Sequence, residues 1–275
     1  MGTELIARGL SPGGSPDMWN LKRPKEVRDV HASYAEAGAQ VLTTNSFGSN
    51  AIRLKASGAH GLIDRLNRAA ARLAREASGD CMVAGDIGPT GEILAPLGKL
   101  SLDETRAAFR AQARELAAAG VDLFIVETFF NLQEARCALE AVREVCSLPV
   151  WVSLTFRRTA RGFFTVYGDR PLPALTMLLE GGADKAGANC TLASADMADL
   201  ATELVPDLGA HAFFQPNAGE PQVDGSRLVY RETPAHFARE MARIAALEPG
   251  AVGGCCGTTP DHIRALAGAL ERRMK

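Results

Sequence analysis

The sequence has almost no net charge and no long apolar run. Its 30 lysines and arginines are balanced by 32 aspartates and glutamates, for a formal net charge of −2. A nucleic-acid-binding surface needs an excess of basic residues, so this balance argues against such a partner. No apolar stretch approaches the roughly 18 residues that span a bilayer, and the first residues lack the basic segment and apolar core of a signal peptide. We therefore expect a cytoplasmic protein with no membrane segment.

Cysteine and the larger aromatic residues are scarce. Six cysteines in 275 residues are too few for a disulfide scaffold, so their chemistry is that of thiols or of metal ligands. Three of them lie in apolar helix or strand patterns, where cysteine acts as a small hydrophobe: Cys81, Cys137 and Cys146. The two tryptophans and three tyrosines could form an aromatic cage for a quaternary ammonium group only if two or three of them met in space, which spacing does not show.

Short apolar runs alternate with longer helical patterns along the whole chain. Seven runs are predicted to be strands, several of them apolar on both faces: 39–44, 81–87, 121–127, 149–156, 183–190, 211–216 and 250–254. Helical spacing predicts eight helices: 24–38, 61–77, 101–119, 131–146, 171–181, 193–205, 233–247 and 260–273. Strands buried on both faces that alternate with helices are typical of a parallel sheet covered by helices.

We expect one domain over residues 1–275, with the α/β fold of a (β/α)₈ TIM barrel. A doubly wound open sheet is the alternative, but the Gly-rich loop that should follow its first strand is missing, since Gly13 and Gly14 follow no strand. One of the eight barrel strands is not visible. The helical segment TELIARGL begins at residue 3, so the first strand would have to precede Met1. We expect that strand to be missing or truncated at the N-terminus.

The working residues of such barrels lie at the carboxyl ends of the strands. The predicted strand ends supply a set of polar and thiol residues: Thr44, Asn45, Asp86, Glu127, Thr155, Cys190, Gln215, Asn217, Cys255 and Cys256. We expect the functional site among these side chains.

Three thiols of this set point to a metal site. Cys190 ends one predicted strand, and the adjacent Cys255 and Cys256 end another that lies two βα units later. Three thiolates with an open fourth position suit Zn²⁺. Such a ligand set leaves the zinc electron-rich and poor at activating water, so a hydrolase is the weaker interpretation. It favours instead an incoming thiol that binds as a nucleophilic thiolate, and hence alkyl transfer to sulfur.

Five segments of the sequence are distinctive: TTNSFGSN (43–50), GDIGPTGE (85–92), GANC (187–190), QPNAG (215–219) and GGCCGTTPDHI (253–263). Together they resemble the homocysteine S-methyltransferase family, which includes the homocysteine-binding barrel of cobalamin-dependent methionine synthase and betaine–homocysteine methyltransferase. The resemblance covers essentially the whole chain. It implies a (β/α)₈ barrel in which zinc is held by Cys190, Cys255 and Cys256.

The resemblance also implies a substrate site. Glu127 matches the acidic residue that holds the substrate ammonium, and Thr44 matches a position near the substrate carboxylate. Asp86 and Asn189 are expected to flank the substrate. Relatives place an Asp-Gly pair, at the end of their first strand, directly before a segment like MGTEL, with which this sequence begins. We therefore expect either a shortened chain or a gap that another segment or subunit fills, with weakened or altered substrate recognition.

The leading hypothesis is a zinc-dependent S-methyltransferase that methylates a small thiol, homocysteine, to give methionine. The segments TTNSFGSN and GDIGPTGE are closer to the methionine synthase branch, which favours a methyl donor on a separate corrinoid or methylfolate protein. The alternative is a non-catalytic or degenerate thiol-binding barrel subunit that acts with such a donor protein. The sequence leaves open the methyl donor, the true acceptor, whether Met1 is the native start, and whether the protein is a homo-oligomer.

Overall fold

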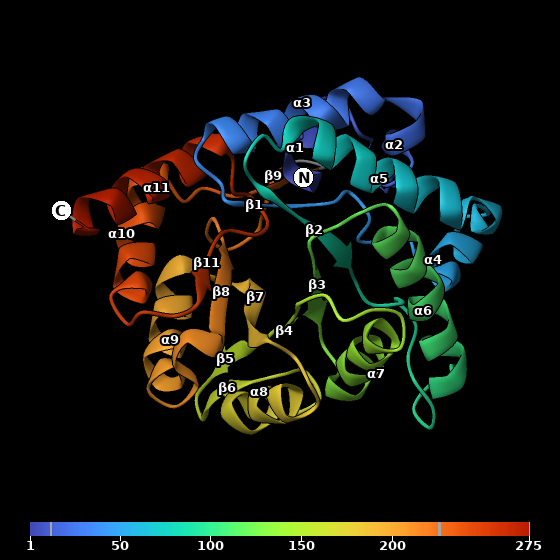
Figure 1. The fold of residues 1–275 in the computed structure, drawn as a ribbon. Helices are drawn as coiled ribbons and strands as arrows, with labels where there is room; N and C mark the ends of the chain where they lie inside the picture. The colour runs from blue at the N-terminus through green and yellow to red at the C-terminus, as the bar shows by residue number, and fades with distance from the viewer. Residues whose placement is uncertain (12, 225–226, 275) are drawn as a thin grey trace.

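A computed structural model describes residues 1–11, 13–224 and 227–274 of the chain. Its centre is a curled parallel sheet with the strand order β1-β2-β3-β4-β7-β8-β11, and helices surround it (Figure 1). Each of these seven strands overlaps a run predicted from the sequence: β1 (Val41–Thr43), β2 (Met82–Ile87), β3 (Leu123–Phe129), β4 (Val150–Leu154), β7 (Lys185–Ala193), β8 (Ala212–Asn217) and β11 (Ala251–Val252).

The helices outside the sheet also match their predicted segments: α3 (Pro24–Glu36), α5 (Ile63–Ala77), α6 (Leu102–Ala118), α7 (Leu132–Arg143), α8 (Pro171–Glu180), α9 (Ser194–Leu208), α10 (Pro234–Ala245) and α11 (Pro260–Met274). Ser101 and Glu104 form a capping box at the start of α6. Shorter helical elements complete the described chain: α1 (Gly2–Ala7), α2 (Trp19–Lys22), α4 (Ala51–Ala56), η1 (His60–Leu62) and η2 (Gly209–His211). None of the described helices is both long and apolar enough to cross a membrane.

Alternation along the strands divides their side chains between the helices and the interior of the curled sheet. In β3, Phe124 and Val126 pack outward in the main core, whereas Ile125 and Glu127 line an interior cavity. Among the β3 side chains that face the cavity, the acidic Glu127 thus follows the apolar Ile125. This alternation is what carries a polar side chain into the interior at the end of an apolar strand.

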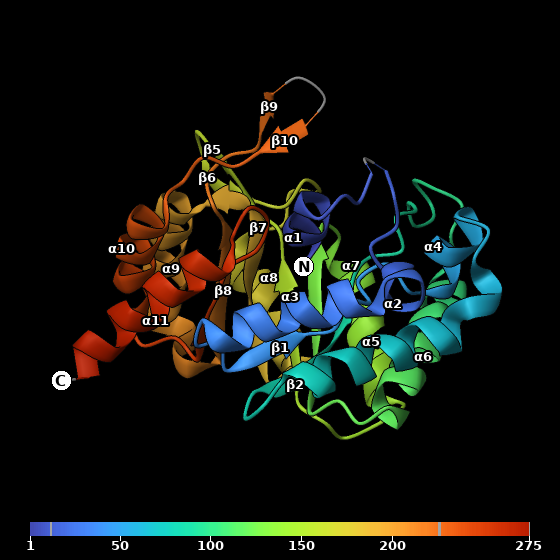
Figure 2. The same ribbon diagram turned by 90° about the horizontal axis from the view of Figure 1, so that it is seen from above.

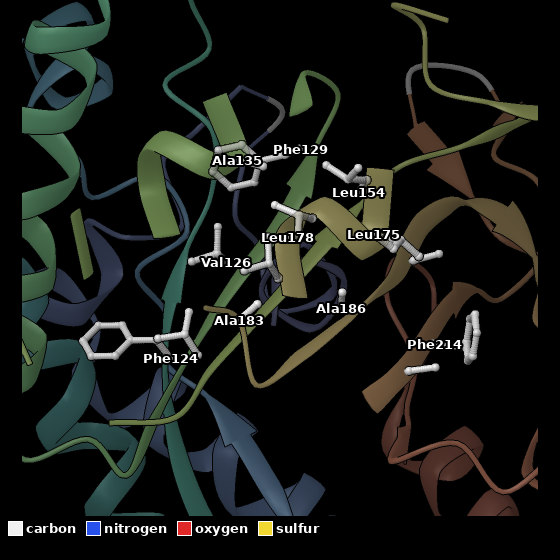
Figure 3. Packing of buried hydrophobic residues seen from close by; sticks show 14 of the residues in the cluster. Phe124, Val126, Phe129, Ala135, Leu154, Leu175, Leu178, Ala183, Ala186 and Phe214 are labelled. Atoms are coloured by element: carbon white, nitrogen blue, oxygen red, sulfur yellow. The ribbon is translucent and has the colours of Figure 1, made fainter. Parts of the chain in front are cut away.

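The main core fills the space between the sheet and the outer helices. Figure 3 shows part of it, with buried side chains from β3, β4, α8 and β8: Phe124, Val126, Leu154, Leu175, Leu178 and Phe214. Full burial of such a side chain stabilises the fold by about 1.5–3 kcal/mol. The packed core therefore fixes the strands whose carboxyl ends carry the polar residues.

The two outermost strands of the sheet do not pair with each other. β1 pairs with β2, and β11 pairs with β8; within residues 1–11, 13–224 and 227–274 no strand joins β1 to β11. The sheet is nevertheless parallel, curled and covered by helices (Figure 1). This arrangement confirms the predicted α/β barrel class, with seven strands in place of eight.

Two hairpins that the sequence patterns did not predict follow the ends of β4 and β8. β5 (Arg157–Thr159) pairs antiparallel with β6 (Gly162–Phe164), and β9 (Gln222–Asp224) pairs antiparallel with β10 (Arg227–Val229). Seen from above, the β9–β10 hairpin projects beyond the rest of the molecule (Figure 2). Their short strands lie at the surface, where β5 is exposed throughout and Val223 of β9 is 79% exposed, so no buried apolar run marks them in the sequence.

Candidate functional site

Cys190 on β7 and the adjacent pair Cys255 and Cys256, which follow β11, come together at the carboxyl end of the sheet. Their three Sγ atoms all lie within 4.8 Å of one another, and Cys190 Sγ is 3.9 Å from Cys256 Sγ. Strand β8 lies between β7 and β11, so the sulfurs meet because the sheet curls. Since Zn–S bonds are about 2.3 Å long, three sulfurs at these separations can bind one metal ion.

The backbone at the end of β7 departs from a regular strand. Cys190 and Thr191 have φ angles of 58° and 51°, in the left-handed region that residues other than glycine rarely adopt. The pairing register of β7 with β8 shifts at the same place, between Asn189 and Ala193. A β-bulge of this kind re-aims a side chain, and strained backbone tends to cluster at functional sites. The bulge turns Cys190 toward the other two cysteines.

The turn that carries Cys255 and Cys256 is held by hydrogen bonds to other segments. The Cys256 N–H donates to Asn217 Oδ1 over 3.1 Å, and Thr258 Oγ1 donates to the Cys255 carbonyl over 2.6 Å. The Tyr34 hydroxyl on α3 donates to the Thr258 carbonyl over 2.7 Å. These bonds restrict the backbone of the cysteine pair, so the two sulfurs are preorganised for a ligand.

The three thiols share their protons unequally. Hydrogen bonds with Cys190 and Cys255 lower the pKa of Cys256 to about 3, so this sulfur is the thiolate of the cluster. The hydrogen bonds with Cys190 and Cys256 raise the pKa of Cys255 well above its usual value, and burial adds to the effect. A thiolate that is already hydrogen-bonded by two thiols becomes a three-thiolate site once a cation displaces the remaining protons.

Asn189 links the cysteine cluster to the neighbouring strand ends. Its side chain is fully buried, and its Nδ2 donates to Glu127 Oε2 over 3.0 Å, to Thr128 Oγ1 over 2.8 Å and to Cys255 Sγ over 3.7 Å. Its Oδ1 accepts from the Thr128 N–H and from the Ser153 hydroxyl, both over 2.9 Å. Because the amide is engaged on both sides, Asn189 fixes the orientation of Glu127 and lies against a cysteine sulfur.

A buried carboxyl group, that of Asp86, and a half-buried one, that of Glu127, lie on the cavity wall near the cysteines. Burial raises the pKa of Glu127 to about 7, and the negative charge of Cys256 adds to this shift. Burial also raises the pKa of Asp86, and the charges of Glu127 and Asp17 raise it further. Asp86 Oδ1 is buried and has no hydrogen-bond partner among the described residues. A site with two such carboxyl groups would stabilise a cation, because a positive charge offsets both the burial and the repulsion between them.

Thr44 lies beside Asp86, but its hydroxyl is already engaged. It accepts from the Asp86 N–H over 2.9 Å. It donates to the Ser46 hydroxyl over 2.6 Å, because Ser46 itself donates to the Asp86 carbonyl over 2.7 Å. A substrate carboxylate could receive a hydrogen bond from Thr44 only in exchange for the bond to Ser46. The contact of Thr44 with a substrate therefore stays a prediction.

One cavity of about 770 Å³ joins these groups. Its wall includes most of the site residues predicted from the sequence: Thr44, Asp86, Glu127, Cys190, Cys255 and Cys256. Asn189 lies behind this wall, and apolar side chains including Ile125, Trp151 and Phe213 line much of the rest. A concave, mostly apolar pocket with a few convergent polar groups is the usual form of a small-molecule site.

Tyr230 contacts the cluster, although no sequence pattern identified it. Its ring lies over Gly257, the residue that follows Cys256, and Tyr230 helps to lower the pKa of Cys256. A Cβ added to Gly257 would lie 2.3 Å from Tyr230 Cγ, and the φ of Gly257 is 79°. Only glycine meets both conditions at this position. Tyr230 follows the β9–β10 hairpin rather than a strand of the main sheet, so the search of predicted strand ends missed it.

The similarity of this protein to known proteins extends over nearly the entire chain. The sequence model of a family described as homocysteine S-methyltransferase matches residues 1–270. The structure is similar to the homocysteine methyltransferase MmuM from Escherichia coli in its metallated form, with a TM-score of 0.77 and 26% sequence identity over 98% of this chain and 93% of that one.

Two further structures extend this comparison. The oxidised form of the Escherichia coli enzyme has a TM-score of 0.77 and 25% identity, over 99% of this chain and 93% of that one. A methyltransferase from Methanosarcina mazei has a TM-score of 0.58 and 11% identity, over 95% of this chain and 89% of that one. At 11% identity the similarity to the Methanosarcina mazei protein concerns the fold alone.

Proposed function

Because the chain belongs to the homocysteine S-methyltransferase family and is thus a methyltransferase, we propose that it transfers a methyl group to the sulfur of homocysteine, giving methionine, with Zn²⁺ as its metal. The observation that carries this proposal is the position of Cys190, Cys255 and Cys256. Their sulfurs lie within 4.8 Å of one another on the wall of the cavity that also holds Glu127 and Asp86. A thiol-binding metal site and an ammonium-binding site therefore share one pocket.

The donor set of the cysteine cluster fits zinc. Three cysteine sulfurs supply soft thiolate ligands and leave a fourth position for a substrate. When bound there, Zn²⁺ would lower the pKa of an incoming thiol from about 8.5, so that it binds as a thiolate at neutral pH. The bulge at Cys190 and the hydrogen bonds around the Cys255–Cys256 turn hold the three sulfurs in position for that ion.

The remaining polar groups of the pocket suit an amino acid. We assign the substrate ammonium to Glu127 and to the unpartnered oxygen of Asp86. Asn189 holds the Glu127 carboxylate in a fixed orientation through its 3.0 Å hydrogen bond. We assign the substrate carboxylate to Thr44, whose hydroxyl would exchange its bond to Ser46 for one to the substrate. These contacts would orient the substrate so that its sulfur reaches the cysteine cluster.

Methyl transfer requires a nucleophilic acceptor sulfur and an electrophilic methyl group. The acceptor loses its thiol proton, its sulfur forms a bond to the methyl carbon, and the bond from methyl to donor breaks with its electron pair remaining on the donor. We propose that the donor is a corrinoid or methylfolate bound to a separate protein. The methionine synthase-like form of residues 43–50 and 85–92 supports this choice.

A donor screen tests the proposed function. The zinc-loaded protein is incubated with homocysteine and, in separate reactions, with methylcobalamin, methyltetrahydrofolate, betaine or S-methylmethionine, and methionine is measured by mass spectrometry. Methionine formation that is lost with a chelator and restored by Zn²⁺ is the expected result. Binding of zinc and homocysteine without methionine from any donor would instead identify a thiol-binding subunit that does not catalyse the reaction.

A further inference from the structure

Glu232, which follows β10, is bonded to both segments of the chain that carry the three cysteines. Its Oε1 accepts a hydrogen bond from the hydroxyl of Ser194, which begins α9 four residues after Cys190. Its main-chain N–H donates to the Ala218 carbonyl over 3.1 Å, and the Ala218 N–H donates to the Cys256 carbonyl over 2.9 Å. One residue thus joins the end of β7 to the turn that carries the other two cysteines.

The carbonyl of Glu232 reaches the same turn by a second route. His262 Nε2 lies 2.9 Å from this carbonyl oxygen, and His262 Nδ1 lies 2.9 Å from Thr259 Oγ1 and 3.2 Å from the Thr259 nitrogen. Because the Thr259 N–H can only donate, Nδ1 is the acceptor and the Nε2–H donates to Glu232. His262 is buried and packs edge-on against Phe237. The start of α11, three residues after Cys256, is therefore also bonded to Glu232.

The bond from Ser194 lies at the downstream end of the bulge that turns Cys190. The pairing of β7 with β8 is regular up to Asn189 and resumes at Ala193, so this pairing does not hold the residues in between. Ser194 is fully buried and directly follows Ala193. A hydrogen bond at Ser194 fixes where the bulge ends, and hence how far Cys190 extends toward the other cysteines.

The burial of the Glu232 carboxyl group is not explained by the stability of the fold. The side chain is 7% exposed, and its Oε2 has no hydrogen-bond partner among the described residues. Besides Ser194, the Oε1 atom has His236 Nε2 as a partner at 2.9 Å. Burying a carboxyl oxygen without a partner is destabilising, which favours a role for Glu232 beyond stability.

We propose that Glu232 is a positioning residue for the metal site. Its three hydrogen bonds hold the end of β7 and the cysteine turn at the separation that one metal ion needs. This inference rests on the proposed function, because it concerns the metal of the same reaction. The three sulfurs lie within 4.8 Å of one another, and a site that is held in this way binds a metal more tightly, since its segments need not be ordered when the ion binds.

A double-mutant cycle on zinc affinity tests the bond between Glu232 and Ser194. Wild type, Glu232→Ala, Ser194→Ala and the double variant are prepared without metal, and the Kd of each for Zn²⁺ is measured by competition with a chromophoric chelator. We expect each single substitution to weaken zinc binding roughly tenfold, the lower end of the range for residues that support metal ligands. The double variant should bind zinc as Glu232→Ala does, because both substitutions remove the same bond.

The matched control is Glu203→Ala, which should leave the zinc Kd unchanged. Glu203 is exposed on α9, and its side chain has no hydrogen bond or ion pair among the described residues. An unchanged Kd in either Glu232→Ala or Ser194→Ala would overturn the proposal. Additive losses in the double variant would overturn it as well, because the two residues would then act separately.

Two further measurements separate positioning from a general loss of structure. Glu232→Gln keeps an oxygen that can accept from Ser194, so it should retain the wild-type Kd, and a tenfold loss in this variant would contradict the hydrogen bond. With Co²⁺ in place of Zn²⁺, the visible absorption bands should shift in Glu232→Ala and Ser194→Ala, because displaced sulfurs change the geometry around the ion. Bands identical to those of wild type would show that the sulfurs have not moved and would reject the positioning role.

The donor screen on the wild-type protein distinguishes this inference from the proposed function. If no methionine forms but the zinc Kd rises roughly tenfold in Glu232→Ala and Ser194→Ala, the proposed function is rejected and the role of Glu232 stands. If methionine forms and the zinc Kd is the same in all the proteins, the role of Glu232 alone is rejected.

Discussion

Asn189 Nδ2 and Glu127 Oε2 are 3.0 Å apart, and this hydrogen bond ties the acidic end of β3 to the residue that precedes Cys190. The same amide group also contacts Cys255 Sγ at 3.7 Å. Asn189 therefore supports two parts of the site: the carboxylate that we assign to the substrate ammonium, and the sulfurs that we assign to the metal. A change in either part would be transmitted to the other through Asn189.

Glu127→Gln should weaken recognition of homocysteine. The substitution keeps the shape of the side chain but removes the charge opposite the substrate ammonium. A charge-assisted hydrogen bond is worth about 1.5–3 kcal/mol, so we expect KM for homocysteine to rise by about one to two orders of magnitude. The control substrate is 4-mercaptobutanoate, which has the thiol and the carboxylate but no ammonium, and its KM should change little. Equal losses with both thiols would contradict the role of Glu127.

Recognition of homocysteine should also depend on pH. Burial raises the pKa of Glu127 to about 7, so the carboxyl is mostly neutral at pH 6 and mostly ionised at pH 8. Because the ionised form binds ammonium, the preference for homocysteine over 4-mercaptobutanoate should increase roughly tenfold between these pH values. Steady-state KM ratios at several pH values measure this preference. In Glu127→Gln the ratio should be flat, and a pH dependence that survives the substitution would assign it to another group.

Cys190→Ala, Cys255→Ala and Cys256→Ala should each remove the metal and methyl transfer while the fold is retained. Each substitution deletes one of three sulfurs that lie within 4.8 Å of one another. Elemental analysis should give about one zinc per wild-type chain and much less in each variant, and circular dichroism should remain that of the folded protein. Cys137→Ala is the matched control, because Cys137 is buried in α7 away from the cluster and should cost only stability, about 1 kcal/mol. Full activity in all three site variants would refute the metal site.

Acid should destabilise the protein partly through His31. Burial lowers the pKa of His31 from an ordinary value of 6.5 to about 3, and its Nε2 has no hydrogen-bond partner in the described part of the chain. Between these pH values the unfolded chain binds a proton that the folded chain does not, so stability falls as the pH drops below 6.5. The loss due to this residue should reach about 2 kcal/mol at pH 5. Urea unfolding of chelator-treated protein at pH 7 and pH 5 measures this loss as a difference in the free energy of unfolding. His31→Gln should reduce that difference. If the difference is unchanged in the variant, His31 is not its source.

Local sequence patterns were enough to predict the order of helices and strands and the position of three cysteines at the carboxyl ends of strands. Apolar runs such as 121–127 and 149–156 are buried on both faces, which favours parallel strands, and their ends then mark one edge of a sheet. That reasoning correctly placed Glu127 and Cys190 on one cavity wall. It could not find the hairpin after β8, because that hairpin lies at the surface, with Val223 79% exposed, and no buried apolar run marks its strands.

The amino-acid sequence was sufficient for the barrel class, for the residues at the strand ends and for the identity of the three sulfurs, because each depends on hydrophobic periodicity and residue type along a short stretch of chain. The tertiary structure alone decided which atoms meet. It turns Cys190 by a bulge, engages the Thr44 hydroxyl with Ser46, and brings the Tyr230 ring against Gly257, beside Cys256. Some of these contacts join residues on separate elements, and others depend on local backbone geometry. Their distances follow from the curl of the sheet and from the position of its register shift. No single segment of the sequence specifies the curl or the register shift.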